Sequence, residues 1–209
     1  MVNRKEHWES VYSTKSATEV SWYQAEAVLS LQLIRDAVPD HSAPLIDVGG
    51  GASVLASQLL SAGYTNLSVL DLSQAALAVA RNALGPRGAR IHWIEADVLD
   101  AELPAAHFQC WHDRAVFHFL TDPAARATYV ARVRHALAPG GYLLVATFAE
   151  DGPTRCSGLD VVRYSPAALG AEFGSGFSLV VTHREEHQTP SGNAQAFSYC
   201  LFRRLPAEH

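Results

Sequence analysis

The stretch LIDVGGGAS, from Leu45 to Ser53, joins a short apolar segment to a cluster of three glycines. The apolar part is typical of a buried strand, and the glycines allow the backbone to turn tightly and to lie close to a ligand. Dinucleotide-binding loops have the spacing Gly-x-Gly-x-x-Gly, which Gly49 and Gly51 fit but Val54 does not. Asp47, two residues before the glycines, would repel a pyrophosphate and favour a ligand that carries positive charge.

Length and composition limit the classes of protein that this chain can represent. Its 209 residues are enough for one α/β domain with a substantial core, and the formal net charge of −5 argues against a nucleic-acid backbone as the main partner. The sequence has no apolar run long enough to span a membrane, and its start lacks the apolar core of a signal peptide. We therefore expect a cytoplasmic protein without a membrane or nucleic-acid partner, in which Cys110, Cys156 and Cys200 are free thiols.

Strand-like segments alternate with helical patterns over the first two thirds of the chain, which is typical of parallel βαβ units. The last third instead contains two strand-like segments joined by the polar turn Thr189–Asn193, which predicts an antiparallel hairpin. We therefore expect a mainly parallel α/β sheet that ends in a hairpin, with a ligand crevice at the carboxyl ends of the strands. The strands are expected at residues 44–48, 67–70, 90–94, 108–111, 142–148, 177–186 and 196–203, and the helices at 21–37, at 52–61, after Ser73 and around Tyr129 and Val133.

Carboxylates follow the second and third expected strands. Asp71 lies twenty residues after Gly51, at a position from which it can accept hydrogen bonds from both ribose hydroxyls of a bound adenosine. Asp97 can accept the adenine amino proton while the Val98 N–H donates to a ring nitrogen, and Leu72 supplies an apolar wall for the adenine. A simpler interpretation is that these aspartates only begin turns.

Four motifs in this order resemble those of the class I S-adenosylmethionine-dependent methyltransferases. They are Asp47-x-Gly49-x-Gly51, Asp71-Leu72-Ser73, Glu95-Ala96-Asp97-Val98 and Leu137-Ala138-Pro139-Gly140-Gly141, and the resemblance covers residues 43–148. It implies a Rossmann-like, doubly wound sheet of seven strands whose last strand is antiparallel. It also implies that S-adenosylmethionine is the cofactor, that S-adenosylhomocysteine is its product, and that Gly49, Gly50 and Gly51 hold the cofactor. Ser53 departs from the pattern, because many members have a third glycine there.

On this resemblance, residues 1–209 form a single methyltransferase domain. Residues 1–40 are expected to form an N-terminal helical cap or lid, 43–148 the cofactor-binding core, and 149–209 the substrate-side segment and the hairpin. Residues 7–24 look like the entry segment of small methyltransferases, in which an aromatic residue covers the cofactor. Trp22 and Tyr23 are the candidates for that cover and for contact with the acceptor, although anchoring the core is an equally good interpretation.

The residues after the fourth strand are the candidates for catalysis. The segment Trp111–Ala115 is similar to the fourth strand of thiopurine-type methyltransferases, and it lacks the Asn/Asp-Pro-Pro-aromatic motif of many nucleic-acid and glutamine methyltransferases. Methyl transfer from a sulfonium depends largely on positioning, and a base is needed only for an acceptor that carries a proton. The candidate catalytic residues are His112, Asp113 and His118; His112 is also a candidate for cofactor contact. His118 can equally be a core histidine, and Asp113 can be structural.

The acceptor pocket is the least defined part of this prediction. Arg114 is expected to contact the acceptor, and Arg163 and Tyr164, in the segment that follows the fifth strand, are expected to form one wall together with Arg155 and Cys156. A metal site at His183 and His187 is rejected, because residues four apart on a strand lie too far apart to share one ion. Cys156 is also rejected as a covalent nucleophile.

Three functions remain open, two of them enzymatic and one without catalysis. The favoured one is methyl transfer to a sulfur, nitrogen or oxygen atom of a small molecule, by a monomer or a homodimer. The alternatives are a protein lysine methyltransferase and a cofactor-binding accessory protein without catalysis. A nicotinamide-dependent reductase is disfavoured by Asp47 and by the missing third glycine.

Overall fold

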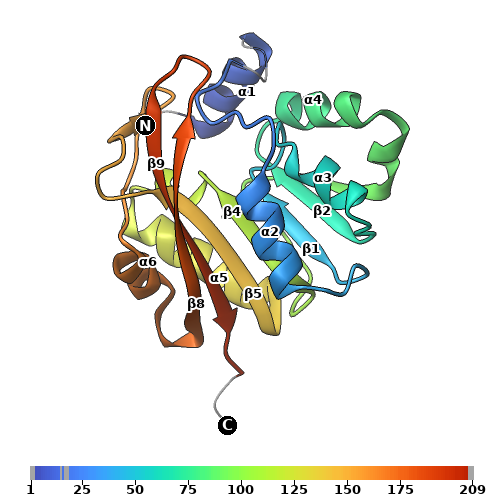
Figure 1. Cartoon of the computed structure of the whole chain (residues 1–209), viewed down its shortest axis with the longest axis vertical. Helices are drawn as coiled ribbons and strands as arrows, with labels where there is room; N and C mark the ends of the chain where they lie inside the picture. The colour runs from blue at the N-terminus through green and yellow to red at the C-terminus, as the bar shows by residue number, and fades with distance from the viewer. Residues whose placement is uncertain (1–2, 15, 17–18, 207–209) are drawn as a thin grey trace.

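The computed structural model describes residues 3–14, 16 and 19–206, and its centre is a sheet of seven strands (Figure 1). The strand order is β3-β2-β1-β4-β5-β9-β8, and all neighbouring strands from β3 to β5 are parallel. Only β9 runs in the opposite direction, since it pairs antiparallel with both β5 and β8. The predicted fold class is therefore confirmed. The strands are β1 (Leu45–Val48), β2 (Leu67–Asp71), β3 (Ile91–Glu95), β4 (Phe108–Arg114), β5 (Leu137–Phe148), β8 (Phe177–Gln188) and β9 (Ala194–Arg204).

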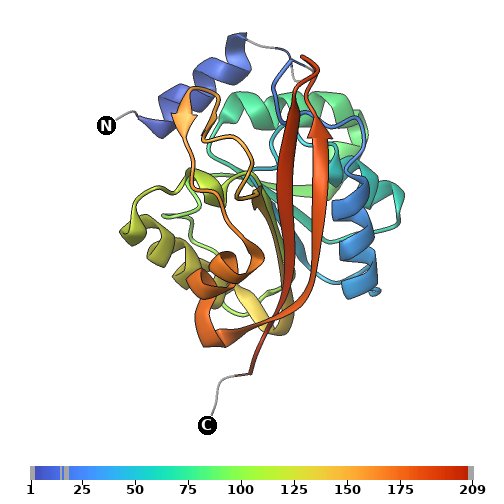
Figure 2. The ribbon, with the colours of Figure 1, turned by 60° about the vertical axis from the view of Figure 1, so that its left-hand side comes forward.

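Helices cover both faces of this sheet, as Figure 2 shows for α2 and α6 on opposite sides of the β8–β9 hairpin. On one face lie α2 (Val28–Ala37), α3 (Leu55–Ser61) and α4 (Gln74–Leu84), which share one hydrophobic cluster. On the other face, α5 (Pro123–Ala136) and α6 (Pro166–Phe173) belong to a second cluster. A further helix, α1 (Arg4–Thr14), lies above the end of the sheet (Figure 1). None of the helices in the described part of the chain is long and apolar enough to cross a membrane.

Several elements differ from the sequence prediction. The helix expected from Ser21 begins only at Val28, because the preceding segment is an irregular loop that places Trp22 beneath α1. The fifth strand begins at Leu137 instead of Tyr142, and the Pro-Gly-Gly segment forms an irregularity within it where the register against β4 shifts. Gly140 has a φ of +79° there, a conformation that suits glycine. Helices α1 and α6 and the short pair β6 (Arg155–Cys156) and β7 (Leu159–Asp160) were not predicted as separate elements.

Successive side chains of β4 alternate between the two faces of the sheet. His112 reaches Ser30 on α2, whereas Trp111 and Asp113 reach Tyr129 on α5. The carboxylate of Asp113 is fully buried and accepts hydrogen bonds from the Tyr129 hydroxyl at 2.6 Å and from the backbone N–H groups of Val116 and Phe117. Burial raises the pKa of Asp113 to about 6. This carboxylate joins β4 to α5, so the structure places the predicted catalytic Asp113 outside the cavities described below.

We expect Tyr129→Phe to lower the free energy of unfolding by about 1.5–3 kcal/mol, because it removes a buried hydrogen bond to a carboxylate. Urea unfolding measures this change, and Tyr142→Phe, at a half-buried tyrosine on β5, is the matched control. The affinity for S-adenosylhomocysteine should not change. A Tyr129→Phe protein as stable as Tyr142→Phe would show that the Asp113 contact does not support the fold.

Candidate functional site

Two adjoining cavities lie at the carboxyl ends of β1, β2, β3 and β4. The first encloses about 770 Å³ and the second about 550 Å³, both including the space open to solvent. The first cavity is bordered by the ends of β2 and β3 and by α1, and the second by α2 and the start of α3. Both are lined by Tyr12, Trp22, Val48, Gly49 and Arg114. The position agrees with the expected crevice of an open α/β sheet.

The glycine loop between β1 and α3 packs so closely that side chains do not fit. Gly49 has a φ of +71°, and a Cβ atom there would lie 2.2 Å from a methyl carbon of Val116. At Gly50 a Cβ atom would lie 2.3 Å from the carboxylate of Asp47, and at Gly51 one would lie 2.6 Å from that of Asp71. Of these three glycines, Gly49 lines both cavities, whereas Gly50 and Gly51 line neither and pack against the two carboxylates.

Asp71 ends β2 and is buried beside this loop. Its two carboxylate oxygens accept hydrogen bonds from the backbone N–H groups of Gly51 at 3.0 Å and Ser73 at 2.9 Å. Burial raises the pKa of Asp71 to about 6, while these two hydrogen bonds act in the opposite direction. Because each oxygen of an ionised carboxylate has two acceptor sites, Asp71 keeps acceptor capacity toward the first cavity, which it lines.

Asp47 is held by a chain of buried side chains from three elements. One of its oxygens lies 2.6 Å from Nδ1 of His112 on β4, and Nε2 of His112 lies 2.9 Å from the hydroxyl of Ser30 on α2. A carboxylate only accepts, so Nδ1 donates to Asp47 and, in the neutral ring, Nε2 accepts from Ser30. The other Asp47 oxygen is buried without a hydrogen-bond partner among the described residues. Asp47 and His112, both predicted to contact the cofactor, line the second cavity. Because both ring nitrogens of His112 already have hydrogen-bond partners, neither is free to act as a base.

Ion pairs and hydrogen bonds of charged side chains hold helix α1 over the first cavity. Arg4 pairs with Asp97 at 2.7 Å, and Lys5 pairs with Glu95 at 2.8 Å. Glu9 accepts hydrogen bonds from the first backbone N–H groups of α4, at Gln74 and Ala75. The helical cap was predicted within residues 1–40, but Arg4, Trp8 and Tyr12 were not predicted to line the cavity. The four-residue spacing of Trp8 and Tyr12 was the available signal.

Four aromatic rings meet where α1 covers the first cavity. The ring centre of Trp8 lies 5.1 Å from that of Phe119 and 5.4 Å from that of Trp22, both edge to face. The indole N–H of Trp22 donates to the hydroxyl of Tyr12 at 3.1 Å. Burial raises the pKa of Tyr12 well above its ordinary value, so the phenol keeps its proton at neutral pH. Leu72, Asp97 and Val98 line the same cavity at its β2–β3 end.

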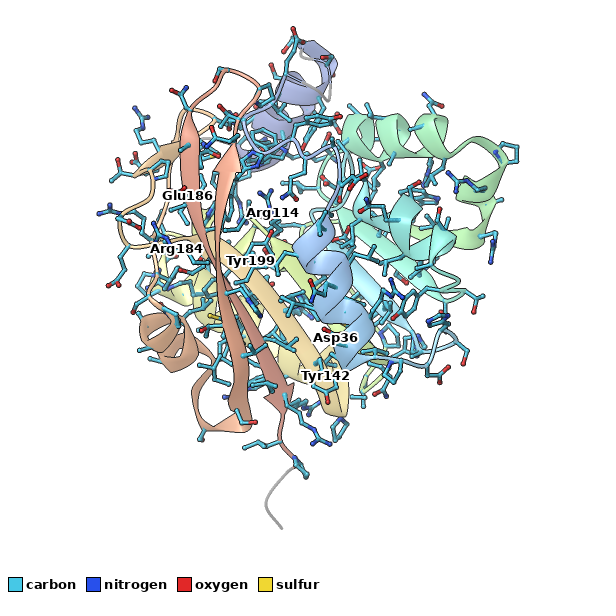
Figure 3. The ribbon with its side chains drawn as sticks, in the orientation of Figure 1. Asp36, Arg114, Tyr142, Arg184, Glu186 and Tyr199 are labelled. Carbon is cyan, nitrogen blue, oxygen red and sulfur yellow. The ribbon has the colours of Figure 1, made fainter. Side chains whose placement is uncertain are left out.

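Arg114, at the end of β4, lines both cavities and is itself tied on several sides. It donates to the hydroxyl of Tyr199 at 2.8 Å and to the carbonyl oxygen of Trp22 at 3.1 Å, and it lies 3.4 Å from the carboxylate of Glu185. Figure 3 shows Arg114, from β4, and Tyr199, from β9, close to each other. Tyr23 lines the second cavity.

His118, Arg163 and Tyr164 also lie outside both cavities. His118 is fully buried, and its Nδ1 accepts from the backbone N–H of Phe148. Burial lowers the pKa of His118 to about 3, and the structure places this predicted catalytic residue in the core, outside both cavities. Arg163 is exposed and bonds to the carbonyl oxygen of Gly152, and Tyr164 packs against Phe117 on the α5–α6 side. The structure thus does not bring these two predicted acceptor contacts to the cavities; from the segment after β5, Cys156 lines the first cavity.

Metal chemistry has no support within the part of the chain that the structure describes. No group of three or more histidine, cysteine or acidic side chains there is arranged to hold a metal ion. His183 and His187, the pair rejected from the sequence, both lie on β8.

Comparison with known proteins agrees with this geometry. A family model described as a methyltransferase domain matches residues 45–141. An uncharacterized methyltransferase of Mycobacterium tuberculosis is 32% identical over 118 residues, which are 54% of this chain and 57% of the relative. The match thus spans little more than half the length of that relative. A Danio rerio protein named EEF1A lysine methyltransferase 2 is 24% identical over 157 residues, covering 68% of this chain and 67% of the relative.

A solved structure supports the fold. It is the 1,6-didemethyltoxoflavin-N1-methyltransferase of Burkholderia thailandensis with bound 1,6-didemethyltoxoflavin and S-adenosylhomocysteine. Its TM-score is 0.70 at 18% sequence identity, over 97% of this chain and 84% of the other. The family match over residues 45–141, the named relatives and the seven-stranded sheet together support a class I S-adenosylmethionine-dependent methyltransferase.

Proposed function

We propose that this protein transfers a methyl group from S-adenosylmethionine to a small-molecule acceptor. The observation that carries the proposal is the glycine loop that packs against two buried carboxylates, Asp47 and Asp71, which line two adjoining cavities. When bound, S-adenosylmethionine supplies a methyl group on a positively charged sulfur, with a neutral thioether as leaving group. The protein's own part is to bind, to orient and to exclude water.

The cavity residues divide between the parts of that cofactor. We assign Asp71 to the ribose hydroxyls, and Asp97 and Val98 to the adenine, with Leu72 as an apolar wall. The unpartnered oxygen of Asp47 is suited to accept a hydrogen bond from the ammonium group of the methionine part. Gly49, Gly50 and Gly51 bring the backbone against the ligand, and Trp22 lies over both cavities. Arg4 donates a hydrogen bond to one carboxylate oxygen of Asp97. That oxygen has a second acceptor site, which the adenine amino group can use.

A protein lysine methyltransferase is the second candidate, and the Danio rerio relative is the observation that favours it. Helix α1 favours a small acceptor, because it contributes Trp8 and Tyr12 to the lining of the first cavity and so limits the space there. Whether the protein is a monomer or a homodimer, and its place in the cytoplasm, stay predictions.

Labelled cofactor distinguishes these functions. The purified protein is incubated with methyl-labelled S-adenosylmethionine, once with a small-molecule extract of cells and once with the proteins of a cell lysate. We expect label in small products, release of S-adenosylhomocysteine, and no labelled protein band. A labelled band would favour the lysine methyltransferase, and tight cofactor binding without any methylated product would favour the accessory protein.

We expect the affinity for S-adenosylhomocysteine to fall as the pH drops through about 6. Asp71 has its pKa raised to about 6 by burial, with smaller contributions from the nearby carboxylates of Asp47 and Glu9, and only its ionised form has full acceptor capacity for the ribose. Calorimetry between pH 5 and pH 8 should show a dissociation constant that is nearly constant above pH 7 and rises by up to about tenfold per unit below pH 6.

Asp71→Asn is the control for this pH dependence. The amide does not titrate, so the variant should bind weakly at every pH and lose the transition near pH 6. If the transition persists in Asp71→Asn, another group is responsible for it.

We expect Ser30→Ala to weaken S-adenosylhomocysteine binding by about two- to tenfold, which corresponds to one lost hydrogen bond. The substitution removes the partner of Nε2 of His112 and so loosens the ring that orients Asp47. Ser61→Ala, at an exposed serine on α3, is the matched control and should bind like the wild type. Equal dissociation constants for the two variants would mean that Ser30 does not position Asp47.

A further inference from the structure

The part of the first cavity left over by the cofactor assignments is dominated by aromatic side chains. Trp8 and Tyr12 come from α1, Trp22 from the loop before α2, and Phe119 from the segment after β4. The ring centre of Trp8 lies 5.1 Å from that of Phe119, 5.4 Å from that of Trp22 and 6.4 Å from that of Tyr12. Aromatic rings at such separations attract further rings in offset or edge-to-face arrangements, so this surface favours a flat aromatic guest.

The charged groups at this end are already paired. Arg114 contacts Glu185 and bonds to Tyr199, and Arg4 is paired with Asp97. Once the carboxylates Asp47, Asp71 and Asp97 serve the cofactor, no acidic side chain among the described lining residues remains to meet an incoming ammonium group. Burying a protonated amine or a lysine side chain here would cost its hydration without a counter-ion.

Three ionisable side chains that line the cavities, His112, Tyr12 and Cys156, are not available as a general base. Both nitrogens of His112 are engaged by Asp47 and Ser30. Tyr12 and Cys156 border the cavity in their protonated forms, because burial raises the pKa of each. An alcohol or an alkylammonium group would therefore keep its proton and would not react.

We propose that the acceptor is a flat aromatic or heteroaromatic compound whose nucleophilic atom is unprotonated at neutral pH, namely an aromatic thiolate or a ring nitrogen. This inference rests on the proposed methyltransferase function. The lone pair of the acceptor forms the bond to the methyl carbon while the carbon–sulfur bond of the sulfonium breaks and leaves its electron pair on sulfur. A thiolate becomes a neutral methyl thioether, and a pyridine-type nitrogen becomes an N-methyl cation, so no proton has to move to the protein.

Matched acceptors test the class directly. S-Adenosylhomocysteine release is measured with thiophenol, cyclohexanethiol, isoquinoline, a primary alkylamine and a lysine peptide, at saturating cofactor and above pH 7. We expect kcat/KM for the aromatic thiol and the ring nitrogen to exceed the values for the other three by at least about tenfold. Preference for the alkylamine or the peptide would overturn the inference and leave the methyltransferase function standing. Absence of any methylated product, or of cofactor binding, would overturn the proposed function itself.

The pH dependence gives a second readout. With substituted thiophenols of different acidity, the midpoint of the kcat/KM profile should move with the pKa of each acceptor, because the acceptor ionises without help from the protein. A midpoint that stays fixed for all acceptors would reveal a protein base and contradict the inference.

A substitution of Trp8, which lines the first cavity, tests whether the aromatic surface binds the acceptor. We expect Trp8→Leu to raise KM for the aromatic acceptors by about two- to tenfold, the range of one aromatic contact, and to leave the dissociation constant of S-adenosylhomocysteine unchanged. Trp8→Phe should retain most of the affinity, and Trp93→Leu, on β3 outside both cavities, is the control. Equal KM values in the folded Trp8→Leu, Trp8→Phe and wild-type proteins would contradict a role of this ring in acceptor binding.

Discussion

The close approach of the glycine loop to two buried carboxylates is the constraint on which this site depends. At Gly50 and Gly51 the space that a side chain would need is filled by the carboxylates of Asp47 and Asp71. The loop can therefore bend sharply at the end of β1 and donate from Gly51 to Asp71, which fixes the ends of β1 and β2 relative to each other. Buried carboxylates at this place are costly, so the arrangement is understandable as preparation for a ligand that satisfies them.

Strand β4 connects this loop to the rest of the molecule through three consecutive side chains. His112 joins Asp47 on β1 to Ser30 on α2, Asp113 joins β4 to Tyr129 on α5, and Arg114 reaches Tyr199 on the hairpin. The first of these contacts bears on cofactor orientation, the second on stability, and the third closes the cavity. One strand thus couples the packing of both helical layers to the geometry of the site.

The sequence predicted the sheet well, but it did not predict which side chains near the fourth strand line the cavities, for physical reasons. Short apolar segments between turns indicate strands, and carboxylates after parallel strands must gather at one edge, so Asp47, Asp71 and Asp97 were placed correctly at the cavities. Strand β4 is buried on both faces, and its pattern therefore does not reveal that Asp113 faces α5. His118 and Tyr164 lie in segments whose direction depends on tertiary packing, and α1 is too polar for its contacts with the cavity to be recognised.

A crystal structure of the protein with S-adenosylhomocysteine tests the central claim most directly. The account predicts the ribose hydroxyls within hydrogen-bonding distance of Asp71, the adenine between Leu72 and Val98 next to Asp97, and the amino group of the ligand at the free oxygen of Asp47. The sulfur should point toward the space between Trp8, Tyr12 and Trp22. A ligand bound elsewhere, with the loop of residues 49–51 making no contact to it, would contradict the account.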